Sequence, residues 1–255
     1  MKTLMIAGLL ALAGGQAGAV AVGSASGSVS VTITGDDADR LDAVFLLGTG
    51  APNPLAETDV LFELVEAPGA FTLTPTIDWP DDTLPALPFD GDAAISAAAD
   101  GGPVGSGGFA TGLGFGVFDA LIDIENNSGD VVGFGLEIVY SLSASASAVG
   151  PNDDALSSAS VEIDFLAPDG ADPDPIEDEV FADALLGPFS ASVDQETILV
   201  TGLSLADGEF FGLDILLDLS AEATAVAPIP VPPAMALLPA GLALLAAAGR
   251  RSRGG

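Results

Sequence analysis

The densest run of potential metal ligands is an acidic segment in the second half of the chain, residues 169–179. Asp169, Asp172, Asp174 and Glu177 place carboxylate oxygens along it, and such oxygens are the ligands that Ca²⁺ prefers. Their spacing differs from that of an EF-hand loop, and the intervening prolines stiffen the chain. The pattern therefore favours a solvated acidic loop, with calcium binding as the alternative.

Trp79 is the second candidate binding residue, because it is the only tryptophan and lies between Asp78 and Asp81. An aromatic ring flanked by carboxylates can stack on a sugar ring. A lone tryptophan more often fills a gap in a core or at its edge. We therefore expect a packing role for Trp79, with carbohydrate binding as the alternative.

The chain contains no histidine and no cysteine, which removes most familiar catalytic and metal sites. No general base titrating near neutral pH, no Ser-His or Cys-His arrangement and no disulfide can form. Paired carboxylates can hydrolyse glycosides, but among 37 acidic residues some pair will be close by chance. The composition therefore predicts a protein that is not an enzyme and that has no cofactor, calcium being the alternative.

The charge of the chain is distributed unevenly. All 37 acidic residues lie between Asp36 and Glu222, where Arg40 is the only base, and the other bases lie near the two ends. Nucleic acids and anionic lipid surfaces need Lys or Arg to neutralise their phosphates. The charge therefore excludes nucleic acid as a partner.

The first 21 residues have the pattern of a secretory signal peptide. Lys2 supplies the positive start, residues 4–13 are apolar, and small residues follow. Two small-x-small sites suit cleavage, one ending at Ala19 and one ending at Ala21. We therefore expect residues 22–226, the acidic body, to work outside the cytoplasm.

The last 29 residues, 227–255, have the pattern of an anchor. Residues 233–249 are uncharged and form a helix candidate of about 26 Å, slightly short of a hydrocarbon core of about 30 Å. Arginines follow at once and favour the cytoplasmic side, which leaves the body outside. The two ends of the chain therefore predict the same topology.

The three parts of this tail also resemble a known sorting signal. A proline motif (Val231, Pro232, Pro233, Ala234), an apolar stretch and an arginine cluster (Arg250, Arg251, Arg253) follow one another. This order resembles the tails of PEP-CTERM and VPLPA-CTERM proteins, although the Pro-Glu-Pro triplet is absent and Val231-Pro232-Pro233-Ala234 lacks the residue between the prolines. The resemblance covers the tail alone. It implies an exosortase-type protease as partner, an inner-membrane intermediate, and a final location at the cell surface or outside the cell. A plain tail anchor is the alternative.

The body between the two ends has the two-residue period of β-strands. Apolar residues occupy every second position in segments 29–34, 120–124, 161–165 and 211–221, with carboxylates between many of them. This alternation is typical of a sheet with one face on a core. Turn sequences at 126–129 and 206–208 predict hairpins. We therefore expect an all-β fold, an antiparallel β-sandwich of jelly-roll or immunoglobulin-like type.

Three segments of the body give weaker signals. Residues 67–108 are rich in Pro, Gly, Asp and Ala, which indicates a long excursion with one or two strands or a boundary between two small sandwiches. Segments 41–47 and 60–65 fit a strand or a helix equally well. Residues 136–146 align with 213–223, as two equivalent long strands would.

These patterns together predict a non-catalytic, exported surface or extracellular-matrix protein. The first alternative is a secreted module that binds carbohydrate, such as an exopolysaccharide, or calcium. The second is a permanently anchored single-pass membrane protein.

Overall fold

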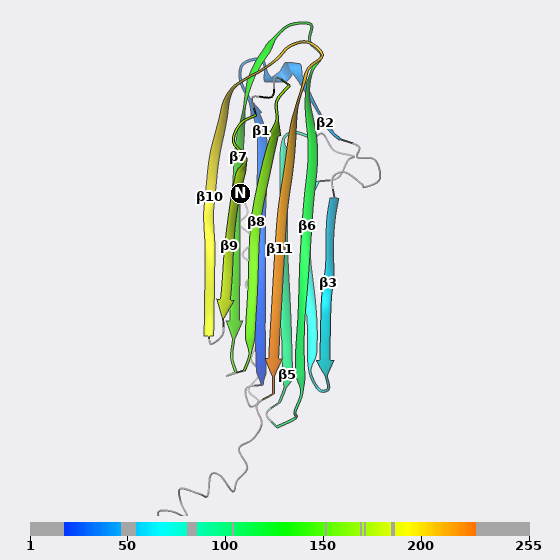
Figure 1. The fold of residues 1–255 in the computed structure, drawn as a ribbon, viewed down its shortest axis with the longest axis vertical. Helices are drawn as coiled ribbons and strands as arrows, with labels where there is room; N and C mark the ends of the chain where they lie inside the picture. The colour runs from blue at the N-terminus through cyan, green and yellow to red at the C-terminus, as the bar shows by residue number, and fades with distance from the viewer. Residues whose placement is uncertain are drawn as a thin grey trace, which may run out of the picture.

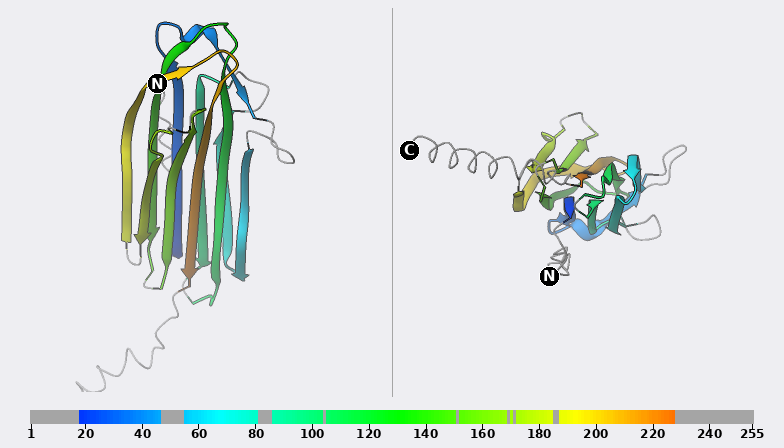
Figure 2. Two further views of the ribbon diagram at one scale, coloured as in Figure 1. Left: turned by 45° about the horizontal axis from the view of Figure 1, so that its top comes forward. Right: turned by 90° about the horizontal axis from the view of Figure 1, so that it is seen from below.

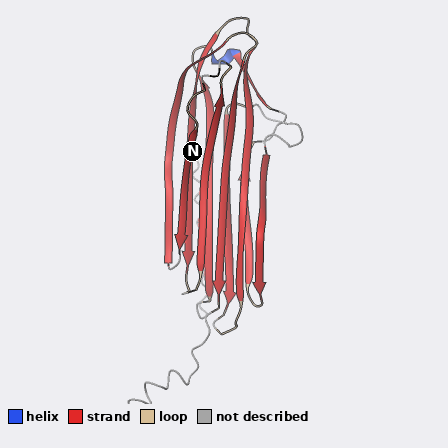
Figure 3. Ribbon diagram, in the orientation of Figure 1, coloured by secondary structure: helices blue, strands red, loops and turns tan. Residues whose placement is uncertain are grey.

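A computed structural model of the chain describes residues 18–46, 55–80, 86–103, 105–150, 152–168, 170, 172–184 and 187–227. These residues form β-strands and one short 3₁₀ helix, η1 (Ala38–Arg40), joined by short loops (Figure 3). All the strand pairs are antiparallel and make up two sheets. The predicted all-β fold of two antiparallel sheets is therefore confirmed.

The two sheets pack face to face as long, straight layers (Figures 1 and 2). The first sheet has the order β10 (Gly187–Leu205), β7 (Val132–Ala148), β1 (Ala19–Thr34), β5 (Phe89–Gly102), β4 (Ala70–Asp78). The second has the order β2 (Leu41–Phe45), β6 (Phe109–Asn126), β11 (Phe210–Val226), β8 (Asp154–Leu166), β9 (Ile176–Ala184). Strand β3 (Leu55–Glu66) pairs with β6 on the same side as β2.

Most connections cross from one sheet to the other. The predicted turns at Gly129 and Gly208 are present, with φ of +85° and +81°. They are not the hairpins that the sequence predicted, because each joins strands of opposite sheets: β6 to β7 and β10 to β11. Tight turns were recognised correctly, but turn residues do not specify which sheet the next strand joins.

The core tapers from one end of the body to the other. Large side chains such as Ile124, Leu136 and Phe211 fill it near η1, whereas alanines such as Ala99 and Ala223 fill the opposite end. There the backbones come close, since a Cβ on Gly23 of β1 would lie 2.6 Å from the carbonyl oxygen of Glu222 of β11. Small residues at the strand ends thus bring the two layers together.

The segments with weak signals all contribute strands. Residues 41–45 form β2 and segment 60–65 lies in β3, and segment 67–108 supplies the edge strand β4 and the inner strand β5. All the described buried hydrophobic residues except Ala148 and Ala227 form one cluster that extends from Ala19 to Ala225. The two aligned segments lie in β7 and β11, which are inner strands of opposite sheets.

The body has two distinct ends. At the turn end, η1 meets the turns that follow β6 and β10 (Figure 1). At the terminal end, β1 begins with Ala19 opposite Gly102, and Ala227 donates its amide to the carbonyl of Gly108, 2.9 Å away. Both ends of the described chain therefore lie at the same end of the body.

Two predicted segments lie outside the described residues: most of the signal peptide and the membrane-helix candidate at 233–249. Among the residues that the structure does describe, no helix has the length and apolar character needed to span a membrane.

Candidate functional site

The outer face of the second sheet carries a dense array of carboxyl groups. On β11, Asp214 and Asp218 flank Leu216, and Leu216 lies between Asp119 of β6 and Glu162 of β8. We call this the carboxylate face. Its outward acidic residues are Asp119, Asp123, Glu125, Asp154, Glu162, Asp164, Glu177, Glu179, Asp183, Asp214, Asp218 and Glu222.

Two of these carboxyls, Asp119 and Asp214, affect each other's pKa. Partial burial, the charge of Asp119 and a hydrogen bond to it raise the pKa of Asp214 to about 6, and Asp164 and Glu162 add to the effect. Burial also raises the pKa of Asp119, although its hydrogen bond with Asp214 opposes this. The pair lies in a small hollow of about 160 Å³. Asp214 is therefore the donor and Asp119 the acceptor in mildly acidic solution.

This geometry limits the chemistry that the pair can perform. Glycosidases hold their two carboxyls about 5–9 Å apart, so that a sugar bond or a water molecule fits between them. Directly hydrogen-bonded carboxyls leave no such space. The Asp119–Asp214 pair can accept hydrogen bonds and exchange a proton, but it lacks the spacing for glycoside hydrolysis.

Asp123 is the most enclosed acid of the carboxylate face. Its side chain is 9% exposed, and its Oδ1 atom has no hydrogen-bond partner among the described residues. Burial, with a smaller contribution from the charge of Glu125, raises the pKa of Asp123. A buried carboxylate without a donor is costly, which is why burial raises this pKa.

A larger hollow of about 410 Å³ opens between β8, β9 and β11. It is lined by Ser160, Val161, Glu162, Glu177, Asp178, Glu179, Leu216 and Asp218. Burial, followed by the charge of Asp119, raises the pKa of Asp218. The hollow offers hydrogen-bond acceptors and negative charge to a ligand, and Val161 and Leu216 are the apolar residues of its lining.

Tyr140 connects the two sheets beside this hollow. The side chain is 3% exposed, and its hydroxyl lies 3.1 Å from Asp178 Oδ2 of β9 and 2.9 Å from Glu196 Oε2 of β10. Burial and both hydrogen bonds raise the pKa of Tyr140. A hydroxyl has one hydrogen, so it donates to one carboxylate at a time. Sequence patterns did not single out Tyr140; its two-residue spacing from the apolar Ile138 and Leu142 is the signal that could have placed it inward.

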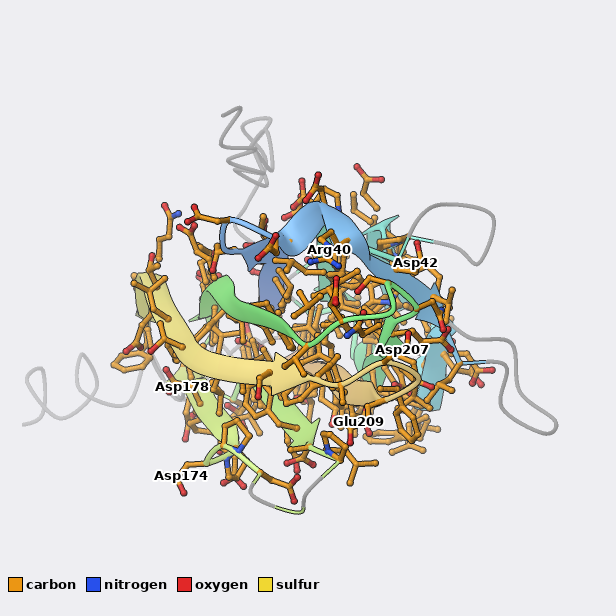
Figure 4. All side chains as sticks on the ribbon, turned by 90° about the horizontal axis from the view of Figure 1, so that it is seen from above. Arg40, Asp42, Asp174, Asp178, Asp207 and Glu209 are labelled. Atoms are coloured by element: carbon orange, nitrogen blue, oxygen red, sulfur yellow. The ribbon has the colours of Figure 1, made fainter. Side chains whose placement is uncertain are left out.

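The predicted calcium ligands are not brought together. Asp172 accepts the Ala167 amide at 2.6 Å and thereby closes the loop after β8. Asp174 lies at the rim of the body (Figure 4), and Glu177 lies within β9 opposite Glu162. Asp169 is outside the described residues. Within the described part of the chain, no three acidic residues are arranged to hold a metal ion.

Trp79 packs against protein side chains. Its ring centroid lies 5.1 Å from that of Phe89 and 5.6 Å from that of Phe118, and its Nε1 donates to the Asp119 carbonyl at 3.4 Å. Gly91 leaves room for the indole, because a Cβ there would touch the ring. The half-buried indole fills the space between the sheets near β4.

A second polar cluster lies at the turn end, seen from above in Figure 4. Asn126 is fully buried and donates to the carbonyls of Asp130 and Leu205 at 2.7 and 2.8 Å. Arg40, the single base of the body, lies 2.8 Å from the Asp130 carboxylate. Asp207 accepts the Gly129 amide at 2.8 Å. These contacts brace the turn that follows β6 and join it to η1 and to the turn that follows β10, which indicates a structural role.

The sorting-signal residues Val231 to Ala234 and the arginines at 250, 251 and 253 lie outside the described residues. Comparisons with protein-family models, curated proteins and solved structures found no match for the chain.

Proposed function

We propose that this chain is an exported, non-catalytic bacterial protein of the cell surface or extracellular matrix, sorted through its C-terminal tail. The observation that carries the proposal is the order of the tail: a proline motif at 231–234, an apolar stretch, and arginines at 250, 251 and 253. An exosortase-type protease would act on this tail while the inner membrane holds it.

The geometry of the body supports this proposal. The leader and the anchor must both engage the same membrane, and the segments that precede Ala19 and follow Ala227 meet the body at one end. Strand β11 has 17 residues and therefore extends about 55 Å at 3.3 Å per residue. A tethered body would present its turn end and its carboxylate face away from the lipid.

A binding module is the second candidate function, and the acid-lined hollow of about 410 Å³ favours it. Its carboxylates suit the hydroxyl groups of a glycan, and its negative charge suits a cation. Such binding would be added to export and would not replace it.

The test of the sorting proposal is the fate of the tail in the native host. Intact mass analysis of the surface fraction should find a C-terminus near residues 231–234. Replacing Arg250, Arg251 and Arg253 with glutamate should abolish inner-membrane retention, because positive charge fixes the cytoplasmic side. Replacing them with lysine preserves charge and should preserve retention. If the protein instead stays in the membrane at full length, the sorting proposal is wrong and the tail is a permanent anchor.

A further inference from the structure

The first strand of the body begins within the region where the leader would be removed. Ala19 pairs with Gly102, but the register shifts between Ala19 and Val20, so the regular ladder with β5 starts at Val20. The Val20 carbonyl accepts the Val149 amide at 3.1 Å. From this residue onward β1 is an integral part of the first sheet.

Ala21, the next residue, is paired with strands on both sides of β1. Ala21 is fully buried and pairs with Ala99 on one side and Ala148 on the other. A cut after Ala21 would remove Val20 and Ala21 and shorten the inner strand β1 at the end where the layers are closest. A cut after Ala19 removes residues that precede the regular ladder.

We infer that the leader is cut between Ala19 and Val20, at the site Ala17-Gly18-Ala19, and that the mature chain begins with Val20. This inference rests on the proposed export, and it chooses between two sequence motifs that are equally acceptable to the peptidase. The fold favours the first site, because a cut after Ala19 removes only the pair of Ala19 with Gly102, whereas a cut after Ala21 also removes two residues of the regular ladder.

The reaction is a peptide hydrolysis by the host peptidase that removes leaders. Water adds across the Ala19–Val20 bond, so Ala19 leaves with a carboxylate and Val20 keeps an amine that becomes protonated. The register places Val20 opposite Asp100 of β5, whose carboxylate already accepts the Gly102 amide at 2.7 Å. The new ammonium group would therefore lie beside a negative charge in a body that has a single base.

The N-terminus of the exported full chain tests the inference. N-terminal sequencing and intact mass analysis should find Val20 as the first residue. A chain that begins at Val22, at Gly18 or at any other residue overturns the inference and leaves export intact. A chain that keeps Met1 and stays in the cytoplasm overturns the proposed export itself, so the two failures are distinguishable.

A pair of leader variants makes the test sharper without touching the sheet. Ala17→Arg places a large charged side chain three residues before the inferred cut, where a small residue is needed, so the precursor should accumulate. Gln16→Arg adds the same charge one residue earlier and should be processed normally to Val20. If Ala17→Arg matures like the unaltered chain, the cut does not follow Ala19.

Discussion

The two outer faces of the body have similar frameworks and different chemistry. On the first sheet, Ser24 of β1 lies 2.7 Å from Ser145 of β7, hydroxyl to hydroxyl, and Ser28 lies 2.9 Å from Ser141. We call this the hydroxyl face. Its outward hydroxyl residues are Ser24, Ser26, Ser28, Ser30, Thr32, Thr72, Thr74, Thr76, Ser96, Ser141, Ser143, Ser145, Ser147, Ser190, Ser192, Thr197 and Ser204.

The difference lies in how neighbouring polar groups satisfy each other. A hydroxyl both donates and accepts, so adjacent serines pair without charge, whereas adjacent ionised carboxylates only accept and repel. Acids do occur on the first sheet, where burial and then the charges of Asp90 and Asp78 raise the pKa of Asp92 near β4. The second sheet carries acids across its inner strands. Sensitivity to pH should therefore be concentrated in the carboxylate face.

The largest expected effect is stabilisation of the whole protein by mild acid. The raised pKa values of Asp119, Asp123, Asp214, Asp218 and Glu222 mean that the folded state binds protons more tightly than the unfolded state. Stability is therefore gained as pH falls through the folded values and lost as pH rises through them. Between pH 7 and pH 5 we expect a gain of about 2 kcal/mol, roughly 5 °C in Tm.

Thermal unfolding followed by circular dichroism at pH 7, 6 and 5, at constant ionic strength, measures this gain. A midpoint that stays level or falls on acidification would show that these carboxyls are not held in an unfavourable environment.

A smaller effect on stability is expected when Asp214, one member of the pair with Asp119, is replaced. Asp214→Asn keeps a hydrogen-bond donor beside Asp119 and removes a charge whose pKa is raised from 3.8 to about 6. Two pKa units correspond to about 3 kcal/mol, but Asp214 is exposed, so solvent screening reduces the expected gain at pH 7 to about 1 kcal/mol. Urea unfolding at pH 7 and pH 5 tests this, and the gain should disappear at pH 5.

The matched control is Asp36→Asn, which removes the same charge from an exposed position at the turn end. It should leave stability nearly unchanged at both pH values. Equal gains from the two variants would mean that total charge matters and that the carboxylate face has no special role.

The smallest effect concerns the hydroxyl face. Ser24→Ala and Ser145→Ala each remove one partner of the 2.7 Å contact, and each should cost about 0.5–1 kcal/mol. The double variant should cost less than the sum, because the second substitution has no hydrogen bond left to break. A urea double-mutant cycle should give the same coupling at pH 5 and pH 7. A coupling that changes with pH would remove the contrast between the faces.

Sequence patterns predicted the strands better than their arrangement. Strict alternation identified parts of β1, β6, β8 and β11, since a buried face imposes a period of two wherever the strand lies. It did not reveal β5, whose inward residues are mostly alanine and glycine, such as Gly91, Ala97 and Ala99. When inward and outward residues are both small, their hydrophobicities differ little and no alternation can be seen. Close packing of the two sheets nevertheless requires these small inward residues.

The candidate site was harder to predict than the fold. Sequence proximity drew attention to residues 169–179, yet the carboxylate face joins acids far apart in the chain, such as Asp119 and Asp214. Alternation placed each acid on an outer face, but strand order determines which acids become neighbours. That order results from turns that cross between sheets, and their residues do not encode the destination.

The path of the chain at the terminal end has a mechanical consequence. The chain leaves the body from the end of β11, which is bonded to β6 and to β8 over most of its length (Figure 1). Tension on an attached tail would pull along the strand axis, across backbone hydrogen bonds that lie perpendicular to it. The hydrogen bonds that join β11 to β6 and to β8 would then all be loaded at once, in shear, instead of breaking one after another. If the body is attached through this strand, tension on the tail would be shared by both ladders of β11.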